Sequence, residues 1–532
     1  MGITKPLKYI NRSSPLLDFG MSTKDKTKET SIANATFVIL LVAIASKLAS
    51  FIVEAVLAAF LGASAIGDAY YMISGIQQVL YPMLSVGIWK VFLPQYEKTL
   101  SLEGTDQADA LANKALFAFT AASILFSALL AIFSGPITAL VAPGFDDQTS
   151  SLCAKLVCIT SPMYIFIIVS SVYATMLQCH NQFFASQVRE IATHAPLIIA
   201  ALLFFDLFGV WALAGGLLVG ALVRLLVEIP FIKWGYRFRL DFHINTPEMR
   251  SMAGQMPSAL LASGADQITI LVNKIIASMQ VAGTVSILNY ASKLQNVFIG
   301  LFSSAVLTAS YPRIAKYVGN NDELALSTLL EKIICTMAIF LLPISIASFV
   351  LGEDLVVVLF QRGAFDADAS AATSIAFICY AAGLLFSALF ALFNNVFYAF
   401  GKAKSSMVSS FISMGSNVVL CILLANFFGA AGLALSASLS YLIASCWQIF
   451  KTRKLVHLNW REILVEVVKS VVSSCAAILP LIAFLPLIDS SLIRLLAGSV
   501  SFAAIYFLLI FLFKTRSSKL LLGLAKRRLK VR

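Results

Sequence analysis

Apolar residues occur along this chain in long continuous runs, separated by short polar stretches, between Ala35 and Phe513. Each run approaches the roughly 20 residues that a membrane-spanning helix needs. Only helices and closed barrels satisfy every backbone hydrogen bond in lipid, and barrel strands alternate apolar and polar residues. Because these runs do not alternate, the pattern predicts an all-α polytopic membrane protein.

About fourteen transmembrane helices are predicted from hydropathy. Their approximate limits are 36–61, 68–93, 112–134, 152–178, 190–208, 210–234, 252–280, 284–311, 328–352, 371–399, 405–428, 430–450, 463–487 and 492–513. The apolar piece 355–360 is too short to span a bilayer, so we expect a loop over 353–370.

Basic residues are concentrated in every second loop. The turns near Gly62, Phe145, Asp206, Ala282 and Asn426 carry almost no Lys or Arg. The alternate loops contain Lys233, Arg237, Arg239, Arg250, Arg313, Lys316, Lys402, Lys404, Lys451, Arg453, Lys454 and Arg461. Since cytoplasmic loops carry the excess of Lys and Arg, this alternation predicts an inner-membrane protein with both termini in the cytoplasm and no signal peptide.

Three short motifs recur at nearly one spacing. LPQYEK (93–98) resembles YPRIAK (311–316), and 312 − 94 = 218 separates their prolines. APGFDD (142–147) resembles RGAFDA (362–367), and FGVWAL (208–213) resembles FGAAGL (428–433); 365 − 145 and 428 − 208 both equal 220. This offset covers about six helices, so it predicts two six-helix lobes in a parallel repeat, plus two extra C-terminal helices, with the substrate site between the lobes.

The repeat and the loop charges predict the following division of the chain. The units are a cytoplasmic segment 1–35, an N-lobe 36–235, a cytoplasmic linker 236–251, a C-lobe 252–454, spans 13 and 14 at 463–513, and a basic cytoplasmic tail 514–532.

Composition supports the membrane class and excludes several others. The chain is 59% hydrophobic and only 12% charged, well below the roughly 25% typical of soluble domains. Its net charge of +12 reflects cytoplasmic loops rather than nucleic-acid binding, and the basic tail is expected to attract anionic membrane lipid. The eight cysteines form no CxxC pair and the four histidines form no ligand spacing, so neither a metal site nor an enzyme is predicted.

Ionisable side chains within the spans are the candidate functional residues, because such charges are costly in lipid and usually face a cavity or a partner. The candidates for substrate binding are Lys47, Glu54, Asp68, Lys274 and Lys293. Lysines in a polar cavity would attract an anionic headgroup such as a phosphate or diphosphate. The alternative is that Lys47 pairs with Glu54, and Asp266 with Lys274, merely neutralising the bundle.

Two further residues are candidates for coupling to a cation. Asp266, in the seventh span, would bind Na⁺ or H⁺ together with Asn417 of the eleventh span. No other cofactor is expected. Arg224 and Glu228 stand four residues apart near a predicted helix end and are interpreted as an ordinary surface pair.

The chain resembles the MviN/MurJ lipid flippases of the multidrug/oligosaccharidyl-lipid/polysaccharide exporter superfamily. The resemblance covers the chain from about Ser46 onward and is clearest in 46–98 and 285–402. The motifs that carry it are Asp68-Ala69-Tyr70-Tyr71, Phe92-Leu93-Pro94, Tyr290-Ala291-Ser292-Lys293-Leu294, Leu359-Phe360-Gln361-Arg362-Gly363-Ala364-Phe365 and Phe397-Tyr398-Ala399. The resemblance implies an alternating-access flippase, in which spans 13 and 14 form a groove for a lipid tail.

Four positions depart from the cavity arginines of that family. Lys47 and Lys293 keep the charge but lose the guanidinium fork, whereas Val53 and Tyr81 lose the charge. We therefore expect a flippase for another polyprenyl-diphosphate-linked saccharide, such as an exopolysaccharide, capsule or O-antigen unit, with glycan-assembly proteins as candidate partners.

The alternatives are a lipid II flippase in peptidoglycan synthesis and a cation-coupled drug exporter. A membrane glycosyltransferase ranks last, because the largest predicted outer loops, 142–150 and 353–370, are short.

Overall fold

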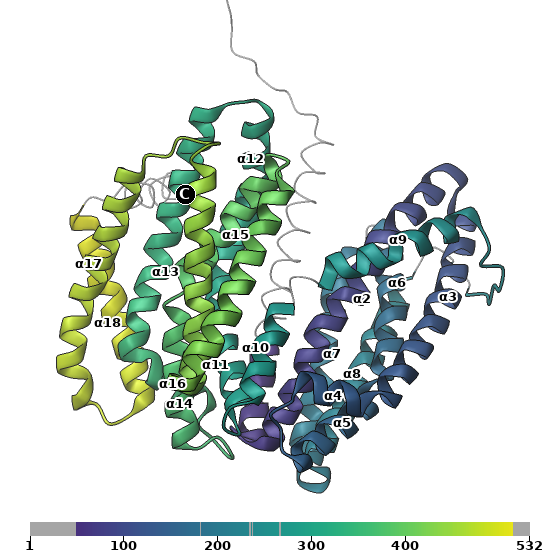
Figure 1. Ribbon diagram of the computed structural model, residues 1–532, viewed down its shortest axis with the longest axis horizontal. Coiled ribbons are helices and arrows are strands. Elements are labelled where there is room, and N and C mark those ends of the chain that lie inside the picture. The colour runs from purple at the N-terminus through teal and green to yellow at the C-terminus, as the bar shows by residue number, and fades with distance from the viewer. Residues whose placement is uncertain (1–48, 181, 233–235, 237, 265–267, 514–532) are drawn as a thin grey trace, which may run out of the picture.

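The computed structural model describes residues 49–513, apart from 181, 233–235, 237 and 265–267. These residues form helices and connecting turns, with no strand in the described ranges. A first helix, Ala49–Leu61, precedes those labelled in Figure 1. The N-terminal half continues with α2 (Ala65–Glu103), α3 (Thr105–Ile132), α4 (Ser134–Val141), α5 (Asp147–Thr160), α6 (Met163–Cys179), α7 (Phe183–Phe208), α8 (Val210–Glu228), η1 (Ile229–Phe231) and α9 (Pro247–Gly264). The C-terminal half contains α10 (Ile268–Ser278), α11 (Thr284–Phe298), η3 (Ile299–Ser304), α12 (Ala305–Gly319), α13 (Glu323–Phe360), α14 (Ala367–Ala381), α15 (Leu384–Ala399), α16 (Ala403–Thr452), α17 (Trp460–Phe484), η4 (Leu485–Leu487) and α18 (Ser491–Leu512).

The predicted spans coincide with these helices, and the all-α polytopic class is confirmed. Within the described ranges, eight helices are long and apolar enough to cross a membrane, and the bent pairs α5–α6 and α14–α15 raise the count to ten. The 50-residue α16 contains two predicted spans, joined at Gly429, where φ is 52°. The other predicted spans fall on the helix that ends at Leu61, on α9 with α10, and on α11 with α12.

The parallel repeat is visible in backbone geometry as well as in sequence. Gly209 (φ 58°, ψ −138°) and Gly429 (φ 52°, ψ −128°) adopt the same conformation, and 429 − 209 = 220. Asp146 caps the start of α5 and Asp366 caps the start of α14, again 366 − 146 = 220 residues apart. The bent pairs that follow these caps have nearly equal angles, 41° and 42°. Equivalent turns, caps and bends at one offset confirm two lobes of the same orientation.

One predicted loop is wrong. Residues 353–360 continue α13 instead of leaving the membrane bundle, so the turn before α14 comprises only 361–366. The acidic residue in this stretch has a partner, because Oδ1 of Asp354 lies 2.9 Å from Nη2 of Arg494 on α18. An acidic side chain paired across helices does not need to end a span.

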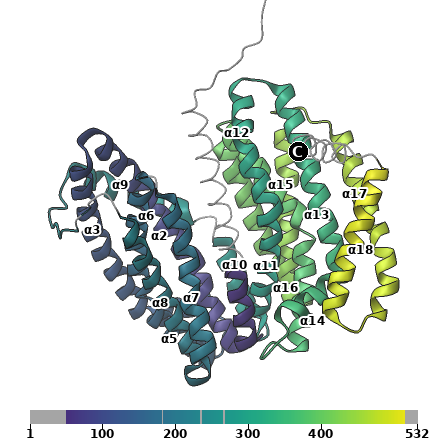
Figure 2. The same ribbon diagram turned by 180° about the vertical axis from the view of Figure 1, so that it is seen from behind.

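The two lobes lie side by side, meet at one end and diverge toward the other (Figures 1 and 2). Close backbone contacts hold the joined end. The amide of Ala364 donates to the carbonyl oxygen of Ala59 at 2.7 Å. A Cβ atom on Gly62 would lie 2.2 Å from the carbonyl oxygen of Ala364, and one on Gly363 would lie 2.2 Å from that of Ala59. These glycines permit an approach that no side chain would allow.

Two helix pairs stand out in their packing. The predicted seventh span is divided: α9 packs against α2, and α10 packs against α16, α2 and α11. At the outer edge of the C-terminal half, α17 and α18 pack against α13 through a small apolar core that includes Leu481 and Tyr506 (Figure 1). A groove for a lipid tail at α17 and α18 stays a prediction.

Substitution of Gly363 by alanine is expected to destabilise the joined end. Gly363→Ala places an L-residue at φ 59° and drives its Cβ into the carbonyl of Ala59. Gly401→Ala is the matched control, since Gly401 has φ 68° but no other atom within 4 Å of the place that an added Cβ would occupy. Both variants incur the left-handed strain of about 1–2 kcal/mol, and only the first adds a backbone clash. Thermal unfolding in detergent should show the larger loss for Gly363→Ala; equal unfolding temperatures would contradict this role.

Candidate functional site

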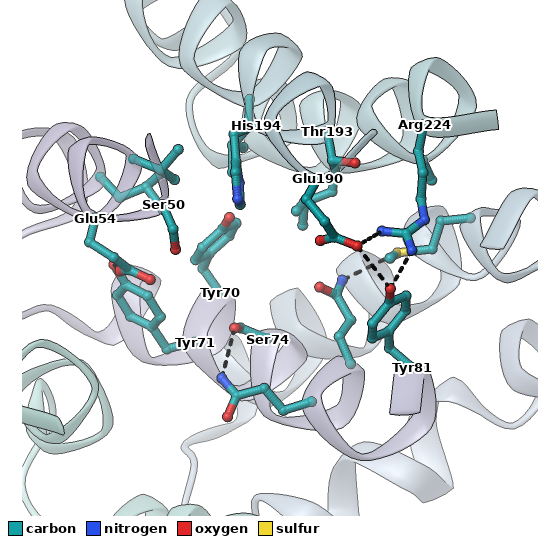
Figure 3. A pocket seen from close by; sticks show the side chains of 18 of the residues that line it. Ser50, Glu54, Tyr70, Tyr71, Ser74, Tyr81, Glu190, Thr193, His194 and Arg224 are labelled. Carbon is teal, nitrogen blue, oxygen red and sulfur yellow. Dashed lines mark hydrogen bonds and ion pairs between the residues drawn. The ribbon is translucent and has the colours of Figure 1, made fainter. Parts of the chain in front are cut away.

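A cavity of about 280 Å³ lies in the N-terminal half, next to the junction of the lobes. Its wall comes from the first described helix, α2, α6, α7 and α8, with one residue from α11 (Figure 3). The polar and ionisable residues that line it are Ser50, Glu54, Tyr70, Tyr71, Ser74, Gln77, Gln78, Tyr81, Glu190, Thr193, His194, Arg224 and Lys293. Such a concentration of polar groups in a membrane bundle makes this cavity the candidate functional site.

Glu54 and Lys293, two of the predicted site residues, meet in this cavity. Oε1 of Glu54 lies 2.8 Å from Nζ of Lys293 on α11. Oε2 of Glu54 accepts hydrogen bonds from the Tyr71 hydroxyl (3.1 Å) and from Nδ2 of Asn289 (3.2 Å), one turn before Lys293. The carboxylate is buried, while the Lys293 side chain retains 31% exposure. The pair therefore joins the two halves of the bundle and leaves its cation accessible from the cavity.

Asp68 takes a different place from the one its sequence position suggested. It is buried and is not among the described residues that line the cavity. Oδ2 accepts from the backbone amide of Gly283, and Oδ1 from both the amide and the hydroxyl of Ser286, all at 2.7 Å. Asp68, on the first turn of α2, thus caps the N-terminus of α11 in the other half, where a carboxylate also complements the helix dipole.

Lys274 also connects the two halves. Its Nζ donates to the backbone carbonyl oxygen of Tyr71 at 2.7 Å, and its chain passes over Gly75, where a Cβ would lie 2.6 Å from Cδ. Lys274 is not one of the described residues that line the cavity. The lysine stem packs along α2 while its ammonium group satisfies a helix carbonyl.

The interpretation of Arg224 and Glu228 as a surface pair is wrong. Both are buried, and each pairs with a residue of α7 rather than with the other. Nη1 of Arg224 lies 2.9 Å from Oε1 of Glu190, and Nη1 of Arg189 lies 2.7 Å from Oε1 of Glu228. Helical i, i+4 spacing makes a pair available, but a buried charge pairs wherever the neighbouring helix places its partner.

The cation-coupling candidates fall only partly within the described ranges. Lys47 and Asp266 lie outside the described residues. Asn417 is buried on α16, where Cys421 contacts both it and Asn273 of α10. Within the described ranges, no group of three or more His, Cys, Asp or Glu side chains is placed to hold a metal ion.

Several cavity residues were not among the predicted site residues. Glu190 and His194, one turn apart on α7, both line the cavity, as do Gln77 and Tyr70 of α2. Glu190 could have been predicted as a site residue, because it is an ionisable residue at the first position of the predicted span 190–208. The helix itself begins earlier, at Phe183, so Glu190 lies within it. The aromatic residues carried no such signal.

A membrane bundle of two repeated lobes, with a charged cavity beside their junction, is the architecture of an alternating-access transporter. Known proteins that this chain is similar to agree with this class. The profile of the family described as "Lipid II flippase MurJ" matches residues 57–508. The chain therefore belongs to the MurJ family, whose members are transporters and not enzymes.

Named relatives share modest identity over most of the chain. The "Probable lipid II flippase MurJ" of Thermotoga maritima is 27% identical over 399 residues, which cover 75% of this chain and 80% of that protein. The protein of the same name from Buchnera aphidicola is 26% identical over 409 residues, with the same two coverages.

Solved structures support the fold. A "Lipid II flippase MurJ, inward closed conformation" has a TM-score of 0.77 and 19% identity, covering 90% of this chain and 98% of that one. An inward-facing multidrug resistance MATE family transporter of the MOP superfamily has a TM-score of 0.65 and 12% identity, covering 79% and 98%. At these identities the likeness concerns the fold alone.

The expectation of a flippase for an exopolysaccharide, capsule or O-antigen unit is wrong. The names of the matching family and of the relatives refer to lipid II flippases instead. The expectation rested on the guanidinium groups lost at Lys47 and Lys293 and on the charge lost at Val53 and Tyr81. At Tyr81 the structure supplies a cation from another helix, because the Arg224 guanidinium lies 4.9 Å from the centre of the tyrosine ring and bonds its hydroxyl.

Proposed function

We propose that this protein is a lipid II flippase, which moves the polyprenyl-diphosphate-linked precursor of peptidoglycan across the inner membrane by alternating access. The observation that carries the proposal is the cavity beside the lobe junction, where Lys293 is accessible and Arg224 lies in the wall. Membership of the MurJ family supports the same substrate. Lysine and arginine are the side chains suited to a diphosphate.

Binding is proposed to begin at Lys293. Its ammonium group is neutralised by Glu54, which belongs to the other half of the bundle. A diphosphate would compete with Glu54 for this cation, with Lys47 as a second cationic candidate. Because the Glu54–Lys293 pair bridges the halves, its exchange for a substrate contact weakens one tie between the lobes. Substrate binding is thereby coupled to their relative movement.

The direction of opening follows from the loop charges. The joined end includes the turn near Gly62, where Lys and Arg are scarce, and the charge rule assigns such turns to the periplasm. The diverging end would then face the cytoplasm (Figure 1). In this proposed orientation both termini are cytoplasmic and the cavity accepts substrate from the inner leaflet.

The energy source is proposed to be an ion gradient or the membrane potential, because the sequence contains no phosphate-cradling glycine loop for a nucleotide. Asp266 and Asn417 stay the candidates for coupling to Na⁺ or H⁺. The division into an N-lobe 36–235 and a C-lobe 252–454, and the attraction of anionic lipid to the tail 514–532, likewise stay proposals.

Genetic rescue tests the substrate. Expression of this protein is expected to restore growth and peptidoglycan synthesis in bacteria depleted of their own peptidoglycan-precursor flippase. A Lys293→Ala variant that accumulates to the same level should fail to do so. Absence of rescue by the wild-type protein, at verified membrane levels, would count against lipid II as the substrate.

A further inference from the structure

A charge network lies along the N-terminal half of the cavity, on the side away from Glu54 (Figure 3). It joins Tyr81 of α2, Arg189 and Glu190 of α7, and Arg224 and Glu228 of α8. The Arg224 guanidinium donates through Nη1 to Oε1 of Glu190 at 2.9 Å and through Nη2 to the Tyr81 hydroxyl. The same hydroxyl donates to Oε1 of Glu190 at 3.4 Å.

The two ion pairs of this network differ in their access to the cavity. The side chain of Glu228 is fully buried, and its Oε1 lies 2.7 Å from Nη1 of Arg189, so this pair is not accessible from the cavity. Glu190 and Arg224 both line the cavity, and the Glu190 side chain is 40% exposed. An ion pair buried in a bundle adds little stability over apolar packing. A second pair on the cavity side therefore calls for a role in binding.

Arg224 is held ready to receive an anion. Cζ of its guanidinium group lies over the Tyr81 ring, 4.9 Å from the ring centre, and this contact fixes the plane of the guanidinium group. Among the described residues, its carboxylate partner within 4.0 Å is Glu190. Glu190 in turn has a second cation nearby, because Nε of Arg189 lies 3.7 Å from the same Oε1. Glu190 can therefore turn from Arg224 toward Arg189 without becoming an unpaired buried charge.

We propose that Arg224 is a second anion subsite of the cavity, at which a phosphate or carboxylate group of the transported lipid precursor exchanges with the carboxylate of Glu190. The proposal rests on the proposed function and adds a recognition residue to it. Guanidinium binds either anion through two parallel hydrogen bonds, and Glu190 holds that position until the substrate arrives. Tyr81 positions the fork without supplying charge.

The exchange predicts opposite effects for the two partners. Binding is measured on the full-length protein in lipid nanodiscs, with lipid II, undecaprenyl diphosphate and inorganic pyrophosphate as probes. Arg224→Gln is expected to weaken lipid II binding at least tenfold, and Arg224→Lys to restore part of it. Glu190→Gln is expected to tighten binding about three- to tenfold, because it removes the competing carboxylate. Arg494→Gln, which breaks an arginine–carboxylate pair of α18 and α13 outside the cavity wall, is the matched control and should leave binding unchanged.

The probes separate the two sources of the anion. If Arg224 takes a phosphate, Arg224→Gln weakens binding of all three; if it takes a carboxylate of the headgroup, only lipid II binding falls. Unchanged lipid II binding by Arg224→Gln, or weakening by Glu190→Gln, would overturn the subsite. The sign for Glu190→Gln decides the matter even if Arg224→Gln does not fold.

The same measurements distinguish this inference from the proposed function. Lipid II binding that depends on Lys293 but not on Arg224 would overturn the subsite alone. Pyrophosphate binding that depends on Arg224, in a protein that does not bind lipid II, would overturn the proposed substrate and leave the subsite standing. A wild-type protein that binds none of the three probes would overturn both.

Discussion

Lys293→Ala is expected to reduce lipid II translocation at least tenfold while the protein still accumulates in the membrane. The substitution removes the accessible cation of the cavity and leaves Glu54 buried without its ion-pair partner. Removing one member of a buried pair costs about 3–5 kcal/mol, because the other charge stays in a poorly solvated site. Lys293→Arg should keep much of the activity, and Lys293→Glu should be worse than alanine, because it repels both Glu54 and a diphosphate. Translocation is measured in membranes with labelled lipid II.

A lysine of similar exposure provides the control. Lys469 on α17 pairs with Glu466 at 3.7 Å and has a side chain 32% exposed, against 31% for Lys293, but it does not line the cavity. Lys469→Ala should translocate lipid II as the wild type does. Equal activity of the Ala, Arg and Glu variants at position 293 would exclude contact between this lysine and the substrate.

Asp68→Ala is expected to reduce translocation by about tenfold or more. The cause is a weaker contact between the lobes at their joined end, and not the loss of a contact with the substrate. Asp68 accepts three hydrogen bonds at the N-terminus of α11, and a bond to a charged group contributes about 1.5–3 kcal/mol. Loss of even about 2 kcal/mol shifts a two-state equilibrium of the lobes roughly thirtyfold toward separation of this end. Labelling of a cysteine introduced at Ala364 should rise in the variant, while lipid II binding at Lys293 persists.

Asp146 offers a matched comparison, since it caps α5 by accepting from the amides of Gln148 and Thr149 within its own turn. Asp146→Ala removes a helix cap but no hydrogen bond between the halves. If it raised the labelling at position 364 as much as Asp68→Ala does, the effect would belong to helix stability and not to the lobe junction.

The sequence was sufficient for the class and the repeat because both depend on periodic, additive signals. Runs of apolar residues decide which segments span, and Gly209 and Gly429 occupy matching turns because a backbone with positive φ favours glycine in both lobes. The predicted loop at 353–370 failed for a physical reason. The apolar piece 355–360 is too short to span by itself, but it continues α13, where Asp354 pairs with Arg494 of α18, 140 residues later by 494 − 354. Hydropathy does not reveal how these two helices pack.

The site was predicted only where a charge stands alone in an apolar run. Glu54 and Lys293 met that condition, and the structure brings them together. Asp68 met it as well, yet it caps a helix more than 200 residues later, which no local pattern encodes. Arg224 was paired with Glu228 from their spacing on one helix. The substrate prediction inherited that error, because the position of Tyr81 was judged without the guanidinium that α8 places over its ring.

Translocation of lipid II by the purified protein in sealed vesicles tests the proposed function most directly. Fluorescent lipid II is placed in one leaflet, and its appearance in the other is followed by quenching from outside, with a polyprenyl-diphosphate-linked polysaccharide unit as the competing substrate. The expected result is transfer of lipid II by the wild-type protein, loss of transfer in Lys293→Ala, and little transfer of the polysaccharide unit. Transfer of the polysaccharide unit without transfer of lipid II would contradict the proposal.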